Sequence, residues 1–419
     1  MKYVVPVLAG RLVRAVARLR GGGSAYPGRT VLALAPDFLT HVSSQFERGV
    51  VFVLGSNGKS TTTMMLTETL RAHGLSVFTN PTGANLPQGI ASAFLREVTP
   101  FGDVKHDIGV IEVDEAFAVE LTKSLNPSTV LMLNVQVDQL YRFFETERVG
   151  TMMTDTAALA SQAVVTNRDD QHLGPYVARP GQTVTRFGAS PEIVAASPNG
   201  LQNANDFTRS ADQTLAAEAE VVALDGAAAT IRVGDVTVEV QLPARGLHYA
   251  VDAAAALQTA AVVLGGSIDA VAAARAFDGM KPAYGRGERM SLGTDDAEFI
   301  MFKNAASLQM NLDALPQGVE QVMLAIDEGT PDISWIYDID FSHLDHVDVL
   351  AGAKAWQLAL RLEHEGIPVH VIEEDISKAI RLMRALPSPS DKTKHFVTNY
   401  EQMMLARRIL GHPDLEKSA

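Results

Sequence analysis

The segment 55–60 holds the residues whose types and spacing are most informative about chemistry. Five apolar residues, Val50–Leu54, lead into two glycines followed by Lys59 and Ser60, and a helical pattern then runs to Gly74. A strand, a glycine-rich turn and a helix in this order are typical of a phosphate-binding loop. Backbone N–H groups and Lys59 can bind phosphate oxygens, the helix N-terminus favours anions, and the Ser60 hydroxyl can bind Mg²⁺. We therefore expect ATP to bind through Gly55, Asn57, Gly58, Lys59, Ser60 and Thr61.

A cluster of acids follows another apolar stretch, Ile108–Val113. Carboxylates at the C-terminal end of a parallel strand face the crevice in which α/β sheets bind ligands. Beside a triphosphate, one of them would supply a hard oxygen ligand to Mg²⁺. The candidates for this metal ligand are the acids of the cluster Glu112-Val113-Asp114-Glu115, together with Ser60.

An arginine between two glycines, Arg286, is a further candidate for phosphate binding. Its guanidinium can pair with phosphate oxygens in a bidentate manner, and the flanking Gly285 and Gly287 leave room for approach. The alternative is a surface turn.

The elements that must position these residues indicate two α/β units. Short apolar stretches alternate with helical patterns over 31–243 and again over 298–412, which predicts parallel sheets covered on both faces. Three short stretches within 221–242 predict a small antiparallel meander, and 188–215 has little periodicity, which indicates a loop or a degenerate insertion. We expect a lead-in at 1–45, a central P-loop ATPase domain at 46–285 and a Rossmann-like domain at 286–419.

Composition excludes several classes of function. The chain has 419 residues, no cysteine and a formal charge of −14, so thiolate chemistry is excluded and a nucleic-acid partner is not expected. No apolar run is long enough for a transmembrane helix, and we expect a cytoplasmic protein. The first 30 residues, however, are basic and free of acids, with apolar residues at helical spacing. They predict a helix that packs on the nucleotide domain or contacts anionic lipid at the inner face of the membrane.

Several motifs resemble the Mur ligase superfamily, whose members activate a carboxylate as an acyl phosphate and join an amine to it. The loop 55–60 is similar to their Gly-x-Asn-Gly-Lys-Ser/Thr, and Gly285-Arg286-Gly287-Glu288 resembles a motif whose arginine reaches the ATP γ-phosphate. The resemblance makes Glu112 the closer match to the family's magnesium ligand, with Glu115 as the alternative.

Other strings resemble the MurT-like branch of that superfamily. They are Asp138-Gln139 after an apolar stretch, the turn-rich segment 79–86, Lys303-Asn304-Ala305, and the string 332–341, which reads DISWIYDIDF. This resemblance implies the ligase subunit of a lipid II isoglutaminyl synthase, which uses ATP and Mg²⁺ to activate the α-carboxylate of D-Glu in the peptidoglycan stem peptide. It also implies a heterodimer with a GatD-like glutamine amidotransferase that supplies ammonia. The family is thought to orient the partner's catalytic histidine with an aspartate, for which Asp332 is the candidate and Asp338 the alternative.

The sequence departs from the family in several places. The usual four-cysteine zinc ribbon is absent from 188–215, so no zinc is predicted. Both asparagines of the adenine-side motif are missing from 246–252, and Asp327-Glu328-Gly329 does not reproduce the family's Asp-Asn pair. Two alternatives therefore stay open: a diverged ligase that joins an amino acid to a related acceptor, and a non-catalytic nucleotide-binding subunit.

Overall fold

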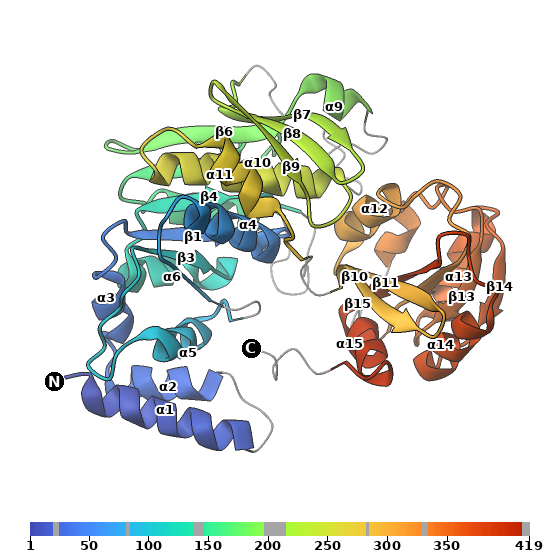
Figure 1. Ribbon diagram of the computed structural model, residues 1–419, viewed down its shortest axis with the longest axis horizontal. Coiled ribbons are helices and arrows are strands. Elements are labelled where there is room, and N and C mark those ends of the chain that lie inside the picture. Colours follow the sequence, from blue (N-terminus) through green and yellow to red (C-terminus); the bar gives the residue numbers. More distant parts are fainter. Residues whose placement is uncertain are drawn as a thin grey trace.

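Two α/β units lie beside each other in the computed structural model (Figure 1). The structure describes residues 1–19, 25–80, 84–136, 146–196, 215–281, 285–327 and 334–412. The first unit is built on a nine-stranded sheet with the order β2-β3-β1-β4-β5-β6-β7-β8-β9. Its strands are β1 Val50–Leu54, β2 Val77–Thr79, β3 Ile108–Glu112, β4 Thr129–Met132, β5 Ala163–Asn167, β6 Thr183–Ala189, β7 Ala219–Asp225, β8 Ala228–Val233 and β9 Val236–Gln241.

Strands β1 to β7 pair in parallel, and β8 and β9 extend the same sheet as an antiparallel meander. Helices cover both faces (Figure 1). They are α4 Lys59–Ala72, α5 Pro87–Glu97, α6 Glu115–Leu125, α8 Thr146–Ala157, α9 Pro191–Ala196, α10 Leu247–Val263 and α11 Ala270–Phe277. The antiparallel meander that the sequence predicts within 221–242 is thus present, and it extends the main sheet.

The central strand β1 shows why this arrangement is stable. All five of its residues are buried, and alternate side chains point to opposite faces of a strand. Val51 and Val53 pack with α4 and α10, whereas Phe52 and Leu54 belong to the core on the other face. A strand that is buried on both faces reads as a continuous apolar run, and that run made β1 recognisable in the sequence.

Three helices precede β1: α1 Val4–Leu19, α2 Ala25–Leu34 and α3 Phe38–Ser43. On the inner side of α1, Val7 is fully buried and the Arg11 guanidinium donates to the carbonyls of Leu95 and Val98. The outer side of α1 carries exposed apolar residues, namely Val5, Leu8, Leu12 and Val16. The helix thus packs on the first unit and also presents an apolar stripe to its surroundings. Among the described residues, no helix is long and apolar enough to cross a membrane.

The second unit has a six-stranded sheet with the order β10-β11-β15-β12-β13-β14. Its strands are β10 Arg286–Leu292, β11 Asp295–Phe302, β12 Val322–Ala325, β13 Val347–Ala351, β14 Val369–Ile372 and β15 Thr393–Asn399. Its helices are α12 Ala305–Asp313, α13 Ala355–His364, α14 Ile376–Ala385, α15 Tyr400–Ile409 and the short 3₁₀ helix η1 Ser334–Asp338. All pairings are parallel except β10 with β11.

The fold is the α/β class that the sequence predicts, with local differences. The segment that begins at Arg286, for which the sequence predicts no strand, forms β10 and pairs with β11. Residues 191–196 of the expected loop form the helix α9, and 197–214 lie outside the described residues. The six residues of α9 span fewer than two helical turns, which is too few to show helical periodicity in the sequence.

Candidate active site

The phosphate-binding loop connects β1 to α4 and requires glycine at position 58. Gly58 has a φ of 82°, and a Cβ atom there would lie 2.4 Å from Asp252 Oδ1 on α10. No described side chain caps the N-terminus of α4, and Thr61 is buried in its first turn. The first backbone N–H groups of a helix have no intrahelical acceptor, so they can bind an anion such as a phosphate.

Lys59 and Glu115 form an ion pair at this loop. Lys59 Nζ lies 2.7 Å from Glu115 Oε1, and the same oxygen accepts a hydrogen bond from the Gly55 N–H at 3.1 Å. Both side chains are largely buried, with exposures of 15% and 7%. Glu115 therefore holds the lysine over the loop, where its ammonium group can bind a phosphate oxygen.

Ser60 and Glu112 meet on the other side of the loop. Ser60 Oγ donates to Glu112 Oε2 at 2.7 Å, and Asn85 Nδ2 lies 3.4 Å from Glu112 Oε1. The backbone of Glu112 is fixed in turn by Asn80, whose side chain accepts from its N–H and donates to its C=O, both at 2.9 Å. A hydroxyl and a carboxylate held together are the oxygen donors that Mg²⁺ prefers, so this pair fits a magnesium ion.

The segment that follows β4 holds the phosphate-binding loop through hydrogen bonds. Asn134 Oδ1 accepts from the Asn57 N–H at 2.9 Å, and its Nδ2 donates to the Asn57 carbonyl at 3.1 Å. Gln136 Oε1 accepts from Asn57 Nδ2, and the Gln136 N–H donates to Ser56 Oγ at 3.0 Å. These bonds fix the backbone of the loop on the side away from Glu112. Asp138 and Gln139, which follow in the sequence, lie outside the described residues.

Two buried acids follow β5, and one of them, Asp170, fixes the segment that follows β4. Asp170 accepts backbone hydrogen bonds from Val135 at 2.7 Å and from His172 at 2.8 Å, and burial raises the pKa of its carboxyl group. Asp169 accepts from the Ala189 N–H and pairs with Arg168. The residues that directly follow β5 form turns.

The exposed side of the phosphate-binding loop faces a cleft between the two units. Asn57 Nδ2 lies 3.3 Å from Asn304 Oδ1 of the second unit. Asn304 also caps α12, where its side chain accepts from the Ser307 N–H at 2.9 Å. The cleft is lined by Asn57, Gly58, Asn134, Gln136, Asn167, His248, Tyr249, Val251, Asp252, Met301, Lys303, Ser307, Met310 and Asn311. Backbone from one unit and a lysine from the other therefore face a common space.

The remaining candidates are less completely placed. Arg286 is the first residue of β10, and its side chain is not described. Two residues on, Glu288 accepts a hydrogen bond from the buried Arg407 and one from the Gly285 N–H. Asp332 lies outside the described residues, whereas Asp338 is exposed at the end of η1.

Comparison with known proteins identifies the type of site. Residues 53–260 match the family of Mur ligase middle domains, and residues 301–403 match the family of MurT ligase C-terminal domains. The chain belongs to the MurT branch of the Mur ligase superfamily. It is an ATP-dependent ligase. The loop 55–60, the glutamates Glu112 and Glu115 beside it, and the cleft between the two units are the parts expected of such an enzyme.

Named relatives extend this MurT-type similarity over the whole chain. The lipid II isoglutaminyl synthase (glutamine-hydrolyzing) subunit MurT of Streptococcus pneumoniae is 25% identical over 447 residues, covering 98% of this chain and 97% of that protein. The corresponding subunit of Staphylococcus aureus is 26% identical, covering 90% of this chain and 92% of that protein.

Solved structures show the same Mur ligase fold. MurF from Acinetobacter baumannii superposes with a TM-score of 0.67 at 17% identity, covering 90% of this chain and 80% of that one. Folylpolyglutamate synthase from Mycobacterium tuberculosis, solved with ADP and AMPPCP, has a TM-score of 0.66 at 15% identity, covering 97% and 99%.

Sequence reasoning gave no individual role to several residues of the site. Asn80 fixes the backbone of Glu112, Gln136 holds Asn57, and Asp252 fills the space that a side chain at position 58 would need. One signal was available for Asn80, because it follows β2, the strand next to β3, and adjacent parallel strands end at the same edge. Asp252 carries no such signal, since it lies within an alanine-rich helix.

Proposed function

We propose that this ligase subunit activates the α-carboxylate of D-Glu in the lipid II stem peptide for amidation to D-isoglutamine. The single observation that carries this proposal is that the loop with the contacts Lys59–Glu115 and Ser60–Glu112 occurs in one chain with a MurT-type C-terminal unit. Both curated relatives are named as subunits of a glutamine-hydrolyzing lipid II isoglutaminyl synthase.

In the proposed reaction, an oxygen of the substrate carboxylate attacks the γ-phosphorus of ATP, and ADP leaves. Ammonia then attacks the acyl carbon, inorganic phosphate leaves, and the nitrogen loses a proton to give the amide. Lys59 and the N–H groups at the start of α4 bind phosphate oxygens, and Arg286 binds the γ-phosphate. Such preorganised donors stabilise charge that develops in the transition state.

Ser60 and Glu112 would hold Mg²⁺, and Glu115 would position Lys59. The geometry favours this division, because Glu112 contacts the serine hydroxyl whereas Glu115 contacts the ammonium group. Mg²⁺ supplies positive charge to the phosphate oxygens when it is bound.

The proposed ammonia source is a GatD-like glutamine amidotransferase that forms a heterodimer with the second unit. A glutaminase of this kind needs a cysteine nucleophile, and the present chain has none. The proposed contact surface includes Asp332, Trp335 and Tyr337. Tyr337 is 55% exposed, and Trp335 packs edge-on against Phe302 with ring centroids 6.1 Å apart, so the two aromatics can anchor a partner on a rigid base.

A peripheral contact with the membrane would bring the enzyme to a lipid-linked substrate. The apolar stripe of α1, formed by Val5, Leu8, Leu12 and Val16, supports it, since these side chains are between 41% and 69% exposed. The acid-free composition of residues 1–30 also favours anionic lipid.

Co-expression with a GatD-like subunit tests the proposed function. The purified complex should amidate lipid II with glutamine and MgATP, and the product should carry one amide at the α-carboxyl of D-Glu. Amidation elsewhere, or addition of an amino acid in place of ammonia, would contradict the proposal.

A further inference from the structure

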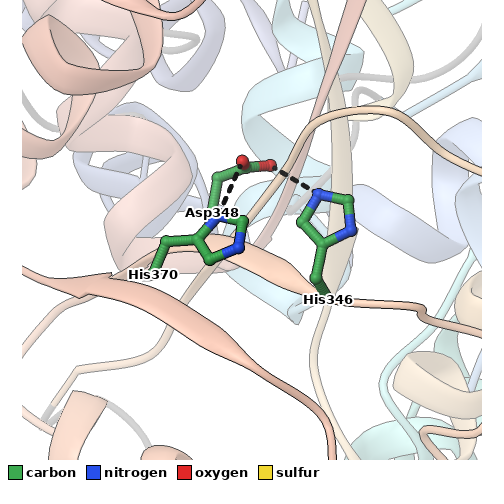
Figure 2. A group of neighbouring side chains, drawn as sticks. All are labelled: His346, Asp348 and His370. Atoms are coloured by element: carbon green, nitrogen blue, oxygen red, sulfur yellow. Dashed lines mark hydrogen bonds and ion pairs between the residues drawn. The ribbon is translucent and has the colours of Figure 1, made fainter.

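Two neighbouring strands of the second unit bring together His346, Asp348 and His370 (Figure 2). Asp348 lies on β13, and His370 lies on the edge strand β14. The parallel register pairs Val347 with Val369 and Val349 with Val371, so Asp348 and His370 are side by side. His346 precedes Asp348 by two residues and therefore projects to the same face.

The nitrogen and oxygen atoms of this group converge. His346 Nε2 lies 3.4 Å from Asp348 Oδ2, and His370 Nδ1 lies 3.3 Å from Asp348 Oδ1. The two imidazole rings stack with centroids 5.1 Å apart, and one ligand atom from each residue lies within 4.8 Å of the others. Among the described residues, this is the one such group of histidines and acids.

The two nitrogen–oxygen separations, 3.4 Å for His346 and 3.3 Å for the hydrogen bond of His370, are long for direct contacts and match the spacing of two ligands on one ion. An N–H···O bond is usually about 2.9–3.0 Å long. Two ligand atoms that each lie about 2.0–2.1 Å from a tetrahedral zinc ion are about 3.3–3.4 Å apart. Because the imidazoles face different oxygens of Asp348, the carboxylate would bind with both oxygens or turn slightly toward one.

Burial and a backbone hydrogen bond hold the carboxylate of Asp348 in place. The side chain of Asp348 is 8% exposed, and its Oδ2 accepts a hydrogen bond from the Val322 N–H at 2.8 Å. Outer hydrogen bonds of this kind orient metal ligands. The imidazoles remain reachable, since the side chains of His346 and His370 are 23% and 56% exposed. A metal could therefore enter from solvent while its anionic ligand stays fixed.

We propose that His346, Asp348 and His370 form a site for a divalent transition metal, with Zn²⁺ the best match. Two imidazoles and one carboxylate suit zinc and disfavour Mg²⁺ and Ca²⁺, which prefer oxygen ligands. The missing cysteines led us to predict no zinc, but a site of this composition needs no thiolate. The ion would join β13 to the edge strand β14, on the side of the sheet toward the N-terminal ends of its parallel strands. Lys303, which lines the cleft, follows the C-terminal end of β11, so the metal would stabilise the second unit without entering the reaction.

Titration of the full, tag-free chain with Co²⁺ in the absence of nucleotide tests this site. We expect one equivalent of Co²⁺ to bind and to show the visible spectrum of a tetrahedral complex. Zn²⁺ should displace the Co²⁺ and should raise the melting temperature of the protein. His370→Ala should weaken binding by about 100-fold or more, because even an outer-shell partner is worth about 10- to 100-fold. His346→Ala provides a second, independent variant should the first fail to fold.

The matched control is His106→Ala. His106 Nε2 lies 3.4 Å from Glu97 Oε2, which reproduces one histidine–carboxylate contact outside the group of three. The control should bind Co²⁺ as the wild type does. Absence of stoichiometric binding to the wild type, or unchanged affinity in a folded His370→Ala or His346→Ala variant, would overturn the proposal.

Discussion

The Ser60 hydroxyl donates a hydrogen bond to Glu112 Oε2 over 2.7 Å, although the two residues are 52 positions apart in the chain. Ser60 lies in the first turn of α4, the helix that follows β1, and Glu112 ends the neighbouring strand β3. The parallel pairing of β1 with β3 brings these two ends together. The strand pairing therefore places a hydroxyl and a carboxylate together beside the phosphate-binding loop.

The first prediction concerns Lys59. Lys59→Ala should abolish acyl-phosphate formation, because a lost charge-assisted phosphate contact costs about 1.5–3 kcal/mol in binding and more in a charged transition state. Release of ADP that depends on lipid II measures the effect. Lys123→Ala, a change of an exposed lysine on α6, is the control and should retain activity. Equal turnover by a folded Lys59→Ala variant would contradict the assignment.

The second prediction separates the two glutamates. Glu112→Gln should raise the Mg²⁺ concentration needed for half-maximal activity, because it removes an anionic oxygen ligand. Glu115→Gln should instead weaken ATP binding, since Lys59 loses its partner. The readouts are a magnesium titration and the Kd for ATP, with the exposed Glu120→Gln as control. If Glu115→Gln alone changes the magnesium requirement, the roles of the two residues must be exchanged.

The third prediction concerns the partner subunit. Asp332→Asn should preserve the heterodimer but greatly reduce glutamine-driven amidation, because a carboxylate behind an imidazole fixes its tautomer and charge. Ammonium salt should restore much of the activity. Asp338→Asn is the comparison variant. Unchanged glutamine-driven turnover in Asp332→Asn would shift the role to Asp338.

The fourth prediction concerns the stripe on α1. The wild-type chain should sediment with vesicles that contain anionic lipid, and Leu12→Glu should reduce the bound fraction, because it places a charge within the exposed apolar face. Val271→Glu changes a similarly exposed residue on α11 and should have no effect. If both variants sediment as the wild type does, the stripe is not a membrane contact.

The fifth prediction concerns stability against pH. His395 on β15 is 4% exposed, and burial lowers its pKa despite the nearby Glu298 and Asp391. The folded state therefore binds fewer protons than the unfolded state below about pH 6.5, so the free energy of unfolding falls as the pH decreases.

Urea unfolding of the wild type and His395→Gln at several pH values measures this contribution. The difference between the two proteins should change by up to about 1.4 kcal/mol per pH unit below that point. A constant difference would show that His395 does not contribute.

The sequence predicted the parts of this structure that depend on short, local patterns. The apolar run of β1 and the glycines before Lys59 identify a phosphate-binding loop, because each has a local physical cause. The sequence could not predict contacts that depend on register between strands, such as Asp348 with His370. Nor could it choose between Glu112 and Glu115, since their contacts with Ser60 and Lys59 depend on how α6 leaves β3.

The most direct test of the central claim uses the isolated chain with lipid II, MgATP and an ammonium salt. The account predicts ADP release that requires lipid II, together with mass-spectrometric evidence of an amide at the α-carboxyl of D-Glu. Omission of ammonium should prevent formation of the amide. Lys59→Ala should prevent both the release of ADP and the formation of the amide. The account would be contradicted if the folded wild-type chain showed no ATP-dependent amidation, or if the amide formed at another carboxyl group.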